Sequence, residues 1–541
     1  MSARALATCL VALSALGVGC ASSSDVVFIG PRFYAGPGAP DAVALRADAH
    51  GRVVALLARY PADGRLVHVP GAYALPGLGD AHVHLSWIAR QDDALALAGL
   101  TSVEAVRTAL EAHASAHPEL AVITGEGWDQ TLWPGAAFPS AADLGAALQR
   151  PAVLTRVDGH AIWLNGPAMA AVADYLAADH ALPERILRGP DGHATGVVVD
   201  PAELLLQRLV PAPRAADLRR WIVAGLARCA DAGLVEIHDM ATTPADLAIL
   251  QDLAAAGPLP VHVVTYLENG KAAFTWLGAH RAGPVAPGSD LEVRGIKLYA
   301  DGALGSRGAA LKAPYSDEPG HSGQASPLDA LVTAAVDAAR AGYDVAIHAI
   351  GDLGNDHALT ALEAAKKAAT RPFRGRVEHA QVIDLADLPR FAAGGFVASM
   401  QPTHATSDMR WAEARLGPER IRGAYAWKTF LAAGVALAFG SDAPVEGFDP
   451  RLALWAATTR RTTAGEPAGG WRTSEAVSFD EAVRAMSAGV AYAAQGEATR
   501  GRWAPGYEVA ISAFDRDPRG DILGAHATAT VRGLRVRVRE P

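Results

Sequence analysis

Two patterns of apolar and polar positions alternate through the middle of the chain. Short apolar runs are separated by longer stretches that are rich in Ala and Leu and have helical periodicity. The runs predict eight strands, at residues 79–85, 234–240, 261–267, 294–302, 344–352, 376–383, 396–402 and 435–444. Helices are predicted between most of these strands, for example at residues 325–342, 354–369 and 421–434. Strands that alternate with helices indicate a parallel sheet, and eight such units predict an α/β protein with a closed (β/α)₈ TIM barrel.

The two ends of the chain have a different pattern. Short strands joined by Gly, Pro and Asp turns are predicted in residues 26–76 and again in 503–541, so we expect both termini to form one small β-sandwich domain. The barrel then occupies residues 77–502. Residues 86–233 are too many for one helical connection, and they predict a long insertion after the first strand, with strands of its own at "LAVITGEGWD" and "PAVLTRVDGH".

Residues 1–20 are predicted to be a signal peptide, because one Arg is followed by an apolar stretch and by small residues. Cys20 and the Ser-rich "ASSSD" after it resemble the lipobox of bacterial lipoproteins, in which the cysteine is acylated. Gly17 departs from that pattern, since a branched apolar residue is usual there. We expect an exported cell-envelope lipoprotein, in the outer membrane or periplasm, that meets a membrane only through a lipid on Cys20. Cleavage near Ala21, giving a secreted soluble protein, is the alternative.

Composition limits the partners of the protein. The chain has 541 residues, of which 50% are hydrophobic and 19% charged, and its net charge is −9. No run of Lys or Arg indicates a nucleic-acid partner. The three cysteines, Cys9, Cys20 and Cys229, cannot build a disulfide framework. No stretch after the signal peptide is long and apolar enough to predict a transmembrane helix. We expect a small-molecule substrate, and the sequence leaves a homo-oligomer open.

The first barrel strand carries an unusual motif, "LPGLGDAHVHLSW" at residues 75–87. Side chains two residues apart in a strand point the same way, so His82 and His84 share one face, with Asp80 beside them. Two neutral imidazoles on one face of a strand can bind a metal ion. Two histidines hydrogen-bonded at a strand end would give the same motif, so the rest of the chain decides between these interpretations.

Potential ligands follow other barrel strands as well. Reactive side chains in this fold lie at the carboxyl ends of the strands, and the fourth, fifth, sixth and eighth strands carry Lys297, His348, His379 and Asp442. Four imidazoles and a carboxylate that meet there predict a divalent metal site. An ammonium group has no lone pair to offer. Lys297 would therefore be a ligand only as a carbamate formed with CO2, whose two oxygens can bridge two metal ions.

Strand alternation predicts which side chains face the barrel interior. Ala346 and His348 share a face, and so do Val377 and His379. Glu378 is then expected to point away from the site and to be structural. Small residues on the same face of these strands, deeper in the barrel, leave room for a cluster of ligands at its mouth.

An ordered set of motifs resembles the amidohydrolase superfamily of metal-dependent hydrolases. The motifs are "LPGLGDAHVHL", "DGHAIWLN", "IKLYADGALGSRGAAL", "HAIGD", "RVEHAQ", "QPTHATSD" and "FGSDAPVEGFDP". They are most similar to the amidohydrolase family 3 branch, which includes N-substituted formamide deformylase. The resemblance covers roughly residues 40 to 518. It implies hydrolysis of carbon–nitrogen bonds other than peptide bonds, in N-acyl, formamide or cyclic amide substrates.

The resemblance also implies a role for each ligand. It assigns His82 and His84 to a first metal ion, His348 and His379 to a second, and carboxylated Lys297 to the bridge between them. Asp442 looks like a metal-bound carboxylate that also acts as the general base. The metal is expected to be Zn²⁺, as one or two ions, although iron, manganese or cobalt fit the same ligands.

Four further residues are candidates for substrate binding. His160 follows a strand-like run in the insertion, where it could polarise a substrate carbonyl or cap its own loop. Asp301 and Arg307 follow Lys297 on a glycine-rich loop, and Arg307 could hold a substrate carboxylate or pair with Asp301. His404 follows the seventh strand, where it could contact substrate or be structural.

Three other residues have two interpretations each. Trp128 and Trp133 could line an aromatic pocket or form the core of the insertion. His238, at the end of the second strand, could point near the site or pack beneath it.

Two other functions remain open from the sequence. The same barrel could hydrolyse an ester or a phosphoester, because the metal ligands do not discriminate between these bonds. A non-catalytic solute-binding lipoprotein is the third reading, and it predicts erosion of the ligand set, whereas all six predicted ligand positions hold competent residues.

Overall fold

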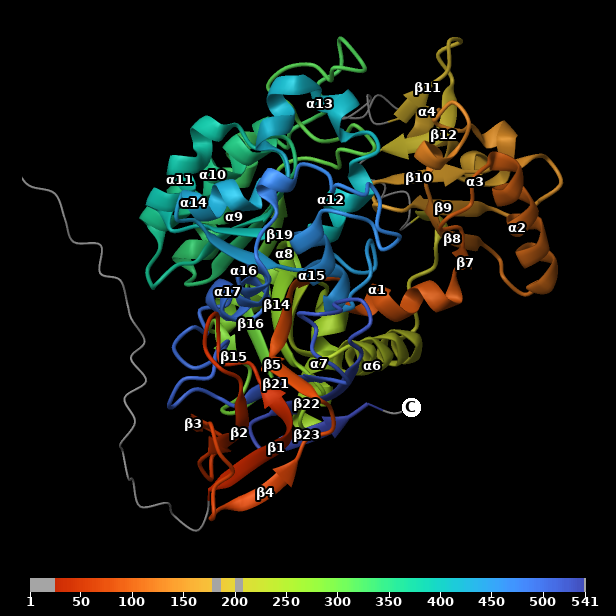
Figure 1. The fold of residues 1–541 in the computed structure, drawn as a ribbon. Helices are drawn as coiled ribbons and strands as arrows, with labels where there is room; N and C mark the ends of the chain where they lie inside the picture. Colours follow the sequence, from red (N-terminus) through yellow and green to blue (C-terminus); the bar gives the residue numbers. More distant parts are fainter. Residues whose placement is uncertain (1–24, 178–185, 200–207, 540–541) are drawn as a thin grey trace, which may run out of the picture.

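The computed structural model describes residues 25–177, 186–199 and 208–539. These residues form three parts: a barrel, a sheet domain built from both ends of the chain, and an insertion after the first barrel strand (Figure 1). The predicted signal peptide, with Cys9 and Cys20, lies outside the described residues.

Eight parallel strands form the barrel. They are β6 (Leu78–Val83), β13 (Leu234–Thr242), β14 (His262–Glu268), β16 (Leu291–Tyr299), β17 (Asp344–Ala349), β18 (Gly375–His379), β19 (Val397–Met400) and β20 (Ala436–Phe439). Each strand pairs in parallel with the next one in this order. All eight overlap strands predicted from the sequence, so the α/β class and the (β/α)₈ barrel are confirmed.

Backbone contacts between the first and last strands close the barrel. Val83 forms a parallel bridge with Ala443. The Asp442 N–H donates to the His82 carbonyl at 2.7 Å, and the His84 N–H donates to the Ala443 carbonyl at 2.8 Å. Three predicted metal ligands therefore belong to the seam at which the barrel closes.

Asp80 and Gly440 explain why the two strands come so close. The Asp80 carboxylate accepts hydrogen bonds from the backbone N–H groups of His82 and Ser441, at 3.0 and 2.9 Å. A Cβ atom on Gly440 would lie 2.6 Å from the backbone nitrogen of His82. Only glycine leaves room for this approach.

Helices cover the outer face of the barrel (Figure 1). They include α6 (Ala215–Asp231), α7 (Pro244–Ala256), α8 (Lys271–Ala279), α9 (Leu328–Arg340), α10 (Asp352–Ala368), α11 (Leu388–Gly394), α12 (Pro402–Asp408), α13 (Ala412–Arg420), α14 (Trp427–Ala432), α15 (Pro450–Thr459), α16 (Phe479–Ala485) and α17 (Ala488–Ala493). In α9, the buried residues Leu331, Ala335, Ala338 and Ala339 lie on one face, because their spacing follows the helical period. In the part of the chain that the structure describes, no helix is long and apolar enough to cross a membrane.

Both ends of the chain contribute strands to one eight-stranded sheet. Its strands are β1 (Val26–Phe33), β2 (Ala42–Ala47), β3 (Val53–Leu57), β4 (Arg65–His68), β5 (Tyr73–Pro76), β21 (Ala510–Phe514), β22 (Ala527–Arg532) and β23 (Arg535–Val538). β5 pairs antiparallel with β21 and so joins the two ends. Phe28 and Ile511 are buried in one cluster to which both ends contribute. The Leu78 N–H donates to Ser512 Oγ at 2.9 Å, which links this domain to the amino end of the barrel. The strands of the two ends are connected by hydrogen bonds into this one sheet domain, in which β1 pairs with β2, β4 and β5.

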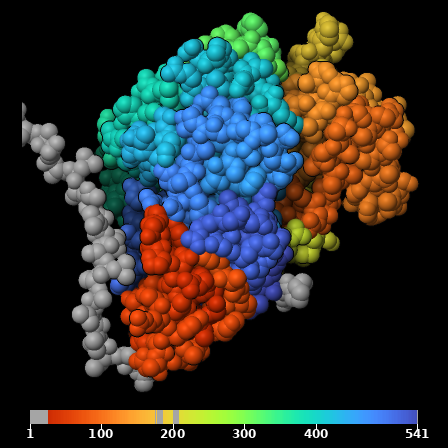
Figure 2. All heavy atoms as spheres, in the orientation of Figure 1, coloured from red at the N-terminus to blue at the C-terminus, as the bar shows by residue number. Residues whose placement is uncertain are grey.

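The insertion has its own sheet and projects beside the barrel (Figure 2). Its elements are β7 (Leu95–Ala96), α2 (Val103–Ala116), β8 (Ile123–Trp128), β9 (Ala152–Arg156), β10 (Ala161–Leu164), α3 (Gly166–Ala171), α4 (Ala173–Ala177), β11 (Ile186–Arg188) and β12 (Ala194–Val199). Trp128 and Trp133 are buried against Trp163, with ring centroids 5.9 and 5.8 Å from it. These tryptophans therefore form the core of the insertion.

Candidate metal centre and substrate pocket

The six side chains predicted as metal ligands meet at the carboxyl end of the barrel. They lie in five strands or directly after them: His82 and His84 (β6), Lys297 (β16), His348 (β17), His379 (β18) and Asp442 (β20). His82, His379 and Asp442 offer ligand atoms that all lie within 4.8 Å of one another. One ion could contact all three side chains at this separation after small adjustments of their positions.

Asp442 lies at the centre of this cluster. Its Oδ1 is 3.3 Å from Nε2 of His82 and 3.2 Å from Nε2 of His84. Its Oδ2 is 3.6 Å from Nε2 of His404. Lys297 Nζ lies 3.4 Å from His82 Nε2. The carboxylate and the amine thus approach the same imidazole nitrogen.

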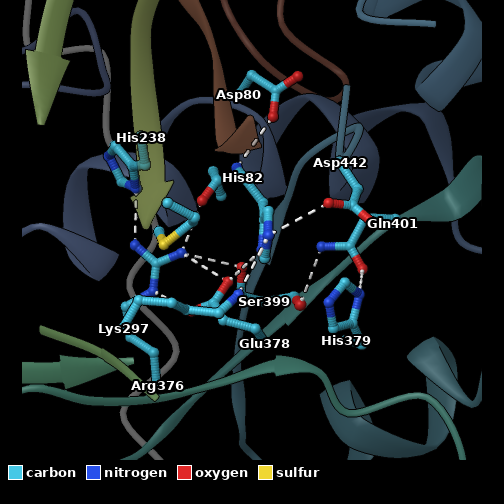
Figure 3. A network of polar contacts seen from close by, with 12 residues as sticks. Asp80, His82, His238, Lys297, Arg376, Glu378, His379, Ser399, Gln401 and Asp442 are labelled. Atoms are coloured by element: carbon cyan, nitrogen blue, oxygen red, sulfur yellow. Dashed lines mark hydrogen bonds and ion pairs between the residues drawn. The ribbon is translucent and has the colours of Figure 1, made fainter. Parts of the chain in front are cut away.

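Hydrogen bonds on Nδ1 orient three of the imidazoles. The acceptors are Glu378 Oε2 for His82 (2.8 Å), the Met240 carbonyl for His84 (3.0 Å) and Gln401 Oε1 for His379 (2.8 Å; Figure 3). Since Nδ1 carries the proton in these bonds, Nε2 keeps its lone pair. His348 is different, because its Nε2 lies 3.3 Å from the Gly302 carbonyl, and this leaves Nδ1 as the donor to a metal.

Burial keeps the histidines in the neutral form that a metal requires. It lowers the pKa of His82 to about 4, and it lowers the pKa values of His348 and His379 well below their usual range. Burial alone would raise the pKa of Asp442, but the adjacent imidazoles hold it well below its ordinary value. Burial also lowers the pKa of Lys297, to about 8. Neutral imidazoles and an ionised carboxylate fit a divalent metal ion.

The inward face of β18 differs from the prediction. Arg376 and Glu378 point into the barrel, where Glu378 meets His82, whereas Val377 packs among the apolar residues between strands and helices. His379 still reaches the cluster, because its φ of 72° turns the chain out of the strand. Positive φ is uncommon for residues with side chains and often marks functional sites. The prediction that Val377 shares the inward face and Glu378 points away is wrong.

A cavity of about 260 Å³ lies over the predicted metal ligands. His348, His379 and Asp442 form part of its wall. The insertion contributes Asp129, Arg156, Asp158 and His160, and loops of the barrel contribute His404, Asp408, Arg410 and Glu446. The insertion and the barrel therefore build the pocket together.

Two of the four predicted substrate-binding residues reach this pocket. The ring of His160 lies 5.1 Å from that of His348, measured between centroids. The ring of His404 stacks on that of His379 with a centroid distance of 5.8 Å and an angle of 10°. Both residues are therefore placed beside the metal ligands.

Asp301 does not line the pocket. Its buried carboxylate accepts hydrogen bonds from the backbone N–H groups of Ala310, Ile350 and Gly351, at 2.9, 2.9 and 2.7 Å. Burial raises its pKa to about 7. Asp301 thus fixes the loops after β16 and β17 to each other and does not belong to the residues that line the pocket.

Arg307 also lies outside the pocket. It pairs with Asp317 at 2.9 Å and with a second carboxylate, rather than with Asp301. The arginines that line the pocket are Arg156 and Arg410. The sequence could not reveal this, because the partner of Arg307 lies further along an irregular loop.

Sequence reasoning missed the polar residues that support the ligands. Glu378 and Gln401 accept hydrogen bonds from ligand histidines, and Arg376 binds Glu378. His238 packs beneath the site, where it accepts a hydrogen bond from Arg376. A signal was present, since polar Arg376 and Glu378 alternate with apolar Val377, as expected of a strand whose polar side chains share one face.

Comparison with known proteins agrees with this geometry. A family model described as the amidohydrolase family matches residues 67–523. The YtcJ protein of Bacillus subtilis, named as an amidohydrolase, is 30% identical over 469 residues, which cover 84% of this chain and 85% of that protein. N-substituted formamide deformylase of Arthrobacter pascens is 26% identical over 480 residues, which cover 84% and 86%. The crystal structure of an uncharacterized metal-dependent hydrolase from Pyrococcus horikoshii OT3 matches with a TM-score of 0.72 and 25% identity, over 93% of this chain and 100% of that one.

The barrel, its cluster of ligands and these similarities define a metal-dependent hydrolase. The chain belongs to the amidohydrolase family. The resemblance inferred from the motifs is therefore confirmed.

Replacing Asp301 is expected to damage the protein, whereas replacing Arg307 is not. Asp301→Ala leaves three buried N–H donors without an acceptor, at about 1–3 kcal/mol each, so both Tm and hydrolysis should fall. Arg307→Ala removes partly exposed ion pairs that contribute about 0–1 kcal/mol. Calorimetry and kcat/KM measure the two effects. If Arg307→Ala lowered kcat/KM at an unchanged Tm, Arg307 would after all contact the substrate.

Proposed function

We propose that the protein hydrolyses carbon–nitrogen bonds other than peptide bonds, in small N-acyl, formamide or cyclic amide substrates. The observation that carries the proposal is the carboxylate of Asp442, which lies within 3.6 Å of three imidazoles at the wall of the pocket. The similarity to N-substituted formamide deformylase supports the choice of bond.

The residues that would hold the metal are His82, His84, His348, His379 and Asp442, with Lys297 as a carbamate. We propose Zn²⁺, as one or two ions, because imidazole and carboxylate ligands suit it. Bound there, a divalent ion would lower the pKa of a water molecule and polarise the substrate carbonyl. Burial supports the carbamate, since a Lys297 pKa of about 8 leaves part of the amine neutral and able to react with CO2.

Asp442 is the proposed general base. Its carboxylate takes a proton from the attacking water while the water oxygen bonds to the carbonyl carbon. As the carbon–nitrogen bond breaks, Asp442 passes this proton to the leaving nitrogen, so the products are a carboxylic acid and an amine. His404 Nε2 has no hydrogen-bond partner among the described residues. We propose that His404 and His160 bind the substrate carbonyl from the pocket side.

We also propose that the protein is exported and anchored through a lipid on Cys20. Cys20→Ser is expected to abolish incorporation of labelled palmitate and to move the protein from the membrane fraction to the soluble fraction. Cys9→Ser is the matched control, since Cys9 would be removed with the signal peptide. Unlabelled wild-type protein in the soluble fraction would favour ordinary cleavage near Ala21 instead.

Metal analysis tests the proposed centre. Protein purified with bicarbonate should contain one to two equivalents of metal by elemental mass spectrometry, as mono- or dinuclear hydrolases do. Lys297→Ala should lower the metal content, whereas Asp442→Asn should keep most of the metal and lose about 10²–10⁴-fold in kcat. Lys312→Ala, which changes a partly exposed lysine paired with Asp384 and Asp387, is the control and should change neither. Metal content that is indifferent to Lys297 would exclude the carbamate, and metal-free wild-type protein would favour a solute-binding protein.

The pocket is expected to prefer uncharged substrates over anionic ones. The three guanidinium nitrogens of Arg156 already donate to Gln130, Asp158 and Asp129, and Arg410 donates to Asp129 at 3.2 Å. Both arginines of the wall are thus already paired with carboxylates of the wall.

N-benzylformamide and its 4-carboxy derivative form a matched pair for this test. We expect kcat/KM to be at least about tenfold higher for the neutral compound, because a carboxylate would meet unpaired negative charge in the wall. Equal kcat/KM values for the two compounds would show that a cation is available to the substrate.

A further inference from the structure

A column of charged and polar side chains fills the centre of the barrel beneath the metal ligands (Figure 3). From the floor upward, the column consists of Arg500, Glu236, His238, Arg376, Glu378 and His82. Every member contacts the next within 3.1 Å. Most barrels of this class fill the same space with branched apolar side chains.

Arg376 is the hub of the column. It is fully buried. Nη1 donates to His238 Nδ1 at 2.7 Å, and Nη2 donates to the Ala81 carbonyl at 2.7 Å and to Ser399 Oγ at 3.0 Å. Nε donates to Glu378 Oε1 at 2.8 Å. One guanidinium thus links strands β6, β13, β18 and β19.

Glu378 bridges Arg376 and His82. Oε1 accepts the Nε–H of Arg376 at 2.8 Å, whereas Oε2 accepts from Nη2 of Arg376 at 3.1 Å and from the Nδ1–H of His82 at 2.8 Å. The contact with the guanidinium therefore holds this carboxylate in place beside His82.

The hydrogen bonds also fix the tautomer of His238. An arginine donates only, so His238 Nδ1 must be the acceptor and Nε2 must carry the proton. The Nε2–H group of His238 then donates a hydrogen bond to Glu236 Oε1, which lies 3.1 Å away. His238 consequently holds the Nη1 end of Arg376 in one orientation.

We propose that Arg376 and His238 are positioning residues that set the metal affinity of the site by acting through Glu378 on His82. His238 orients Arg376, Arg376 holds Glu378, and Glu378 keeps the Nδ1 proton of His82 away from the metal side of the ring. The inference rests on the proposal above that His82 is a metal ligand.

The chain contains a matched control for His238. His262 is also buried in a barrel strand, with Nε2 at 3.0 Å from Glu292 Oε1 and Nδ1 at 3.4 Å from Arg532 Nη2. It has the same kind of carboxylate and arginine partners, but among the described residues neither Glu292 nor Arg532 forms a hydrogen bond or ion pair with a predicted metal ligand. Glu292 meets the column only at its floor, through Arg500 at 2.8 Å. A merely structural role of buried His–Glu–Arg groups would affect both positions alike.

The experiment measures Zn²⁺ dissociation constants of the metal-free protein by competition with a chelator, together with Tm. We expect His238→Leu to weaken Zn²⁺ binding about 10-fold or more, the usual effect of losing a residue that orients a ligand. His238→Asn should restore most of the affinity, because its amide oxygen can accept from Arg376. His262→Leu should leave the affinity unchanged even where it lowers Tm.

A second pair keeps the test decisive if His238→Leu does not fold. Arg376→Lys removes the guanidinium group that contacts Glu378 and His238, so it should weaken Zn²⁺ binding. Arg460→Lys, at another fully buried arginine, should not weaken it. Equal Zn²⁺ affinity in Arg376→Lys and wild type, or equal losses in the two members of either pair, would overturn the inference. His82→Ala separates the two proposals, since unchanged Zn²⁺ binding there would refute the metal site itself.

Discussion

The buried ion pair between Arg376 and Glu378 is the interaction on which the proposed arrangement of metal ligands depends. A metal-binding imidazole needs its second nitrogen held by an acceptor, and for His82 that acceptor is Glu378. A carboxylate in the middle of a barrel would take up a proton if it stood alone, because burying a single charge costs several kcal/mol. The guanidinium of Arg376 supplies the opposite charge, and its other donors are satisfied by His238 and the neighbouring strands. The polar centre of this barrel is thus one connected network.

The backbone places the ligands as much as the side chains do. His379, at the end of β18, and Asp442, three residues after β20, both have positive φ, of 72° and 62°, so the backbone turns at each residue whose side chain joins the cluster. The peptide groups around His82 and Asp442 also close the barrel, with Asp80 tying the seam. The contacts that close the barrel therefore also position the predicted ligands. A substitution that disrupts the contacts between the first and last strands would move these side chains.

The sequence predicted the barrel well because its strands are short apolar runs between helices, and this pattern is strong in parallel sheets. It also predicted that His82, His379 and Asp442 come together, since they lie at or just after strand ends. It failed at β18, where His379 leaves the strand through a backbone turn that side-chain alternation cannot express. It failed for Arg307 because the geometry of a long loop decides the partner, here Asp317. The support of His82 by Glu378 crosses the barrel between residues 296 positions apart, and only the closed fold brings them together.

The predicted ligands and much of the pocket wall come from different parts of the protein. The ligand cluster belongs to the barrel, whereas a large part of the wall comes from the insertion, where Arg156 holds Asp129 and Asp158 in place. Arg410, from the barrel, donates to Asp129 of the insertion at 3.2 Å and so joins the two parts across the pocket. The shape and charge of the wall consequently depend on how the insertion docks, while the ligands depend on the barrel core. Changes in the insertion can therefore alter which substrate fits without disturbing the groups that carry out hydrolysis.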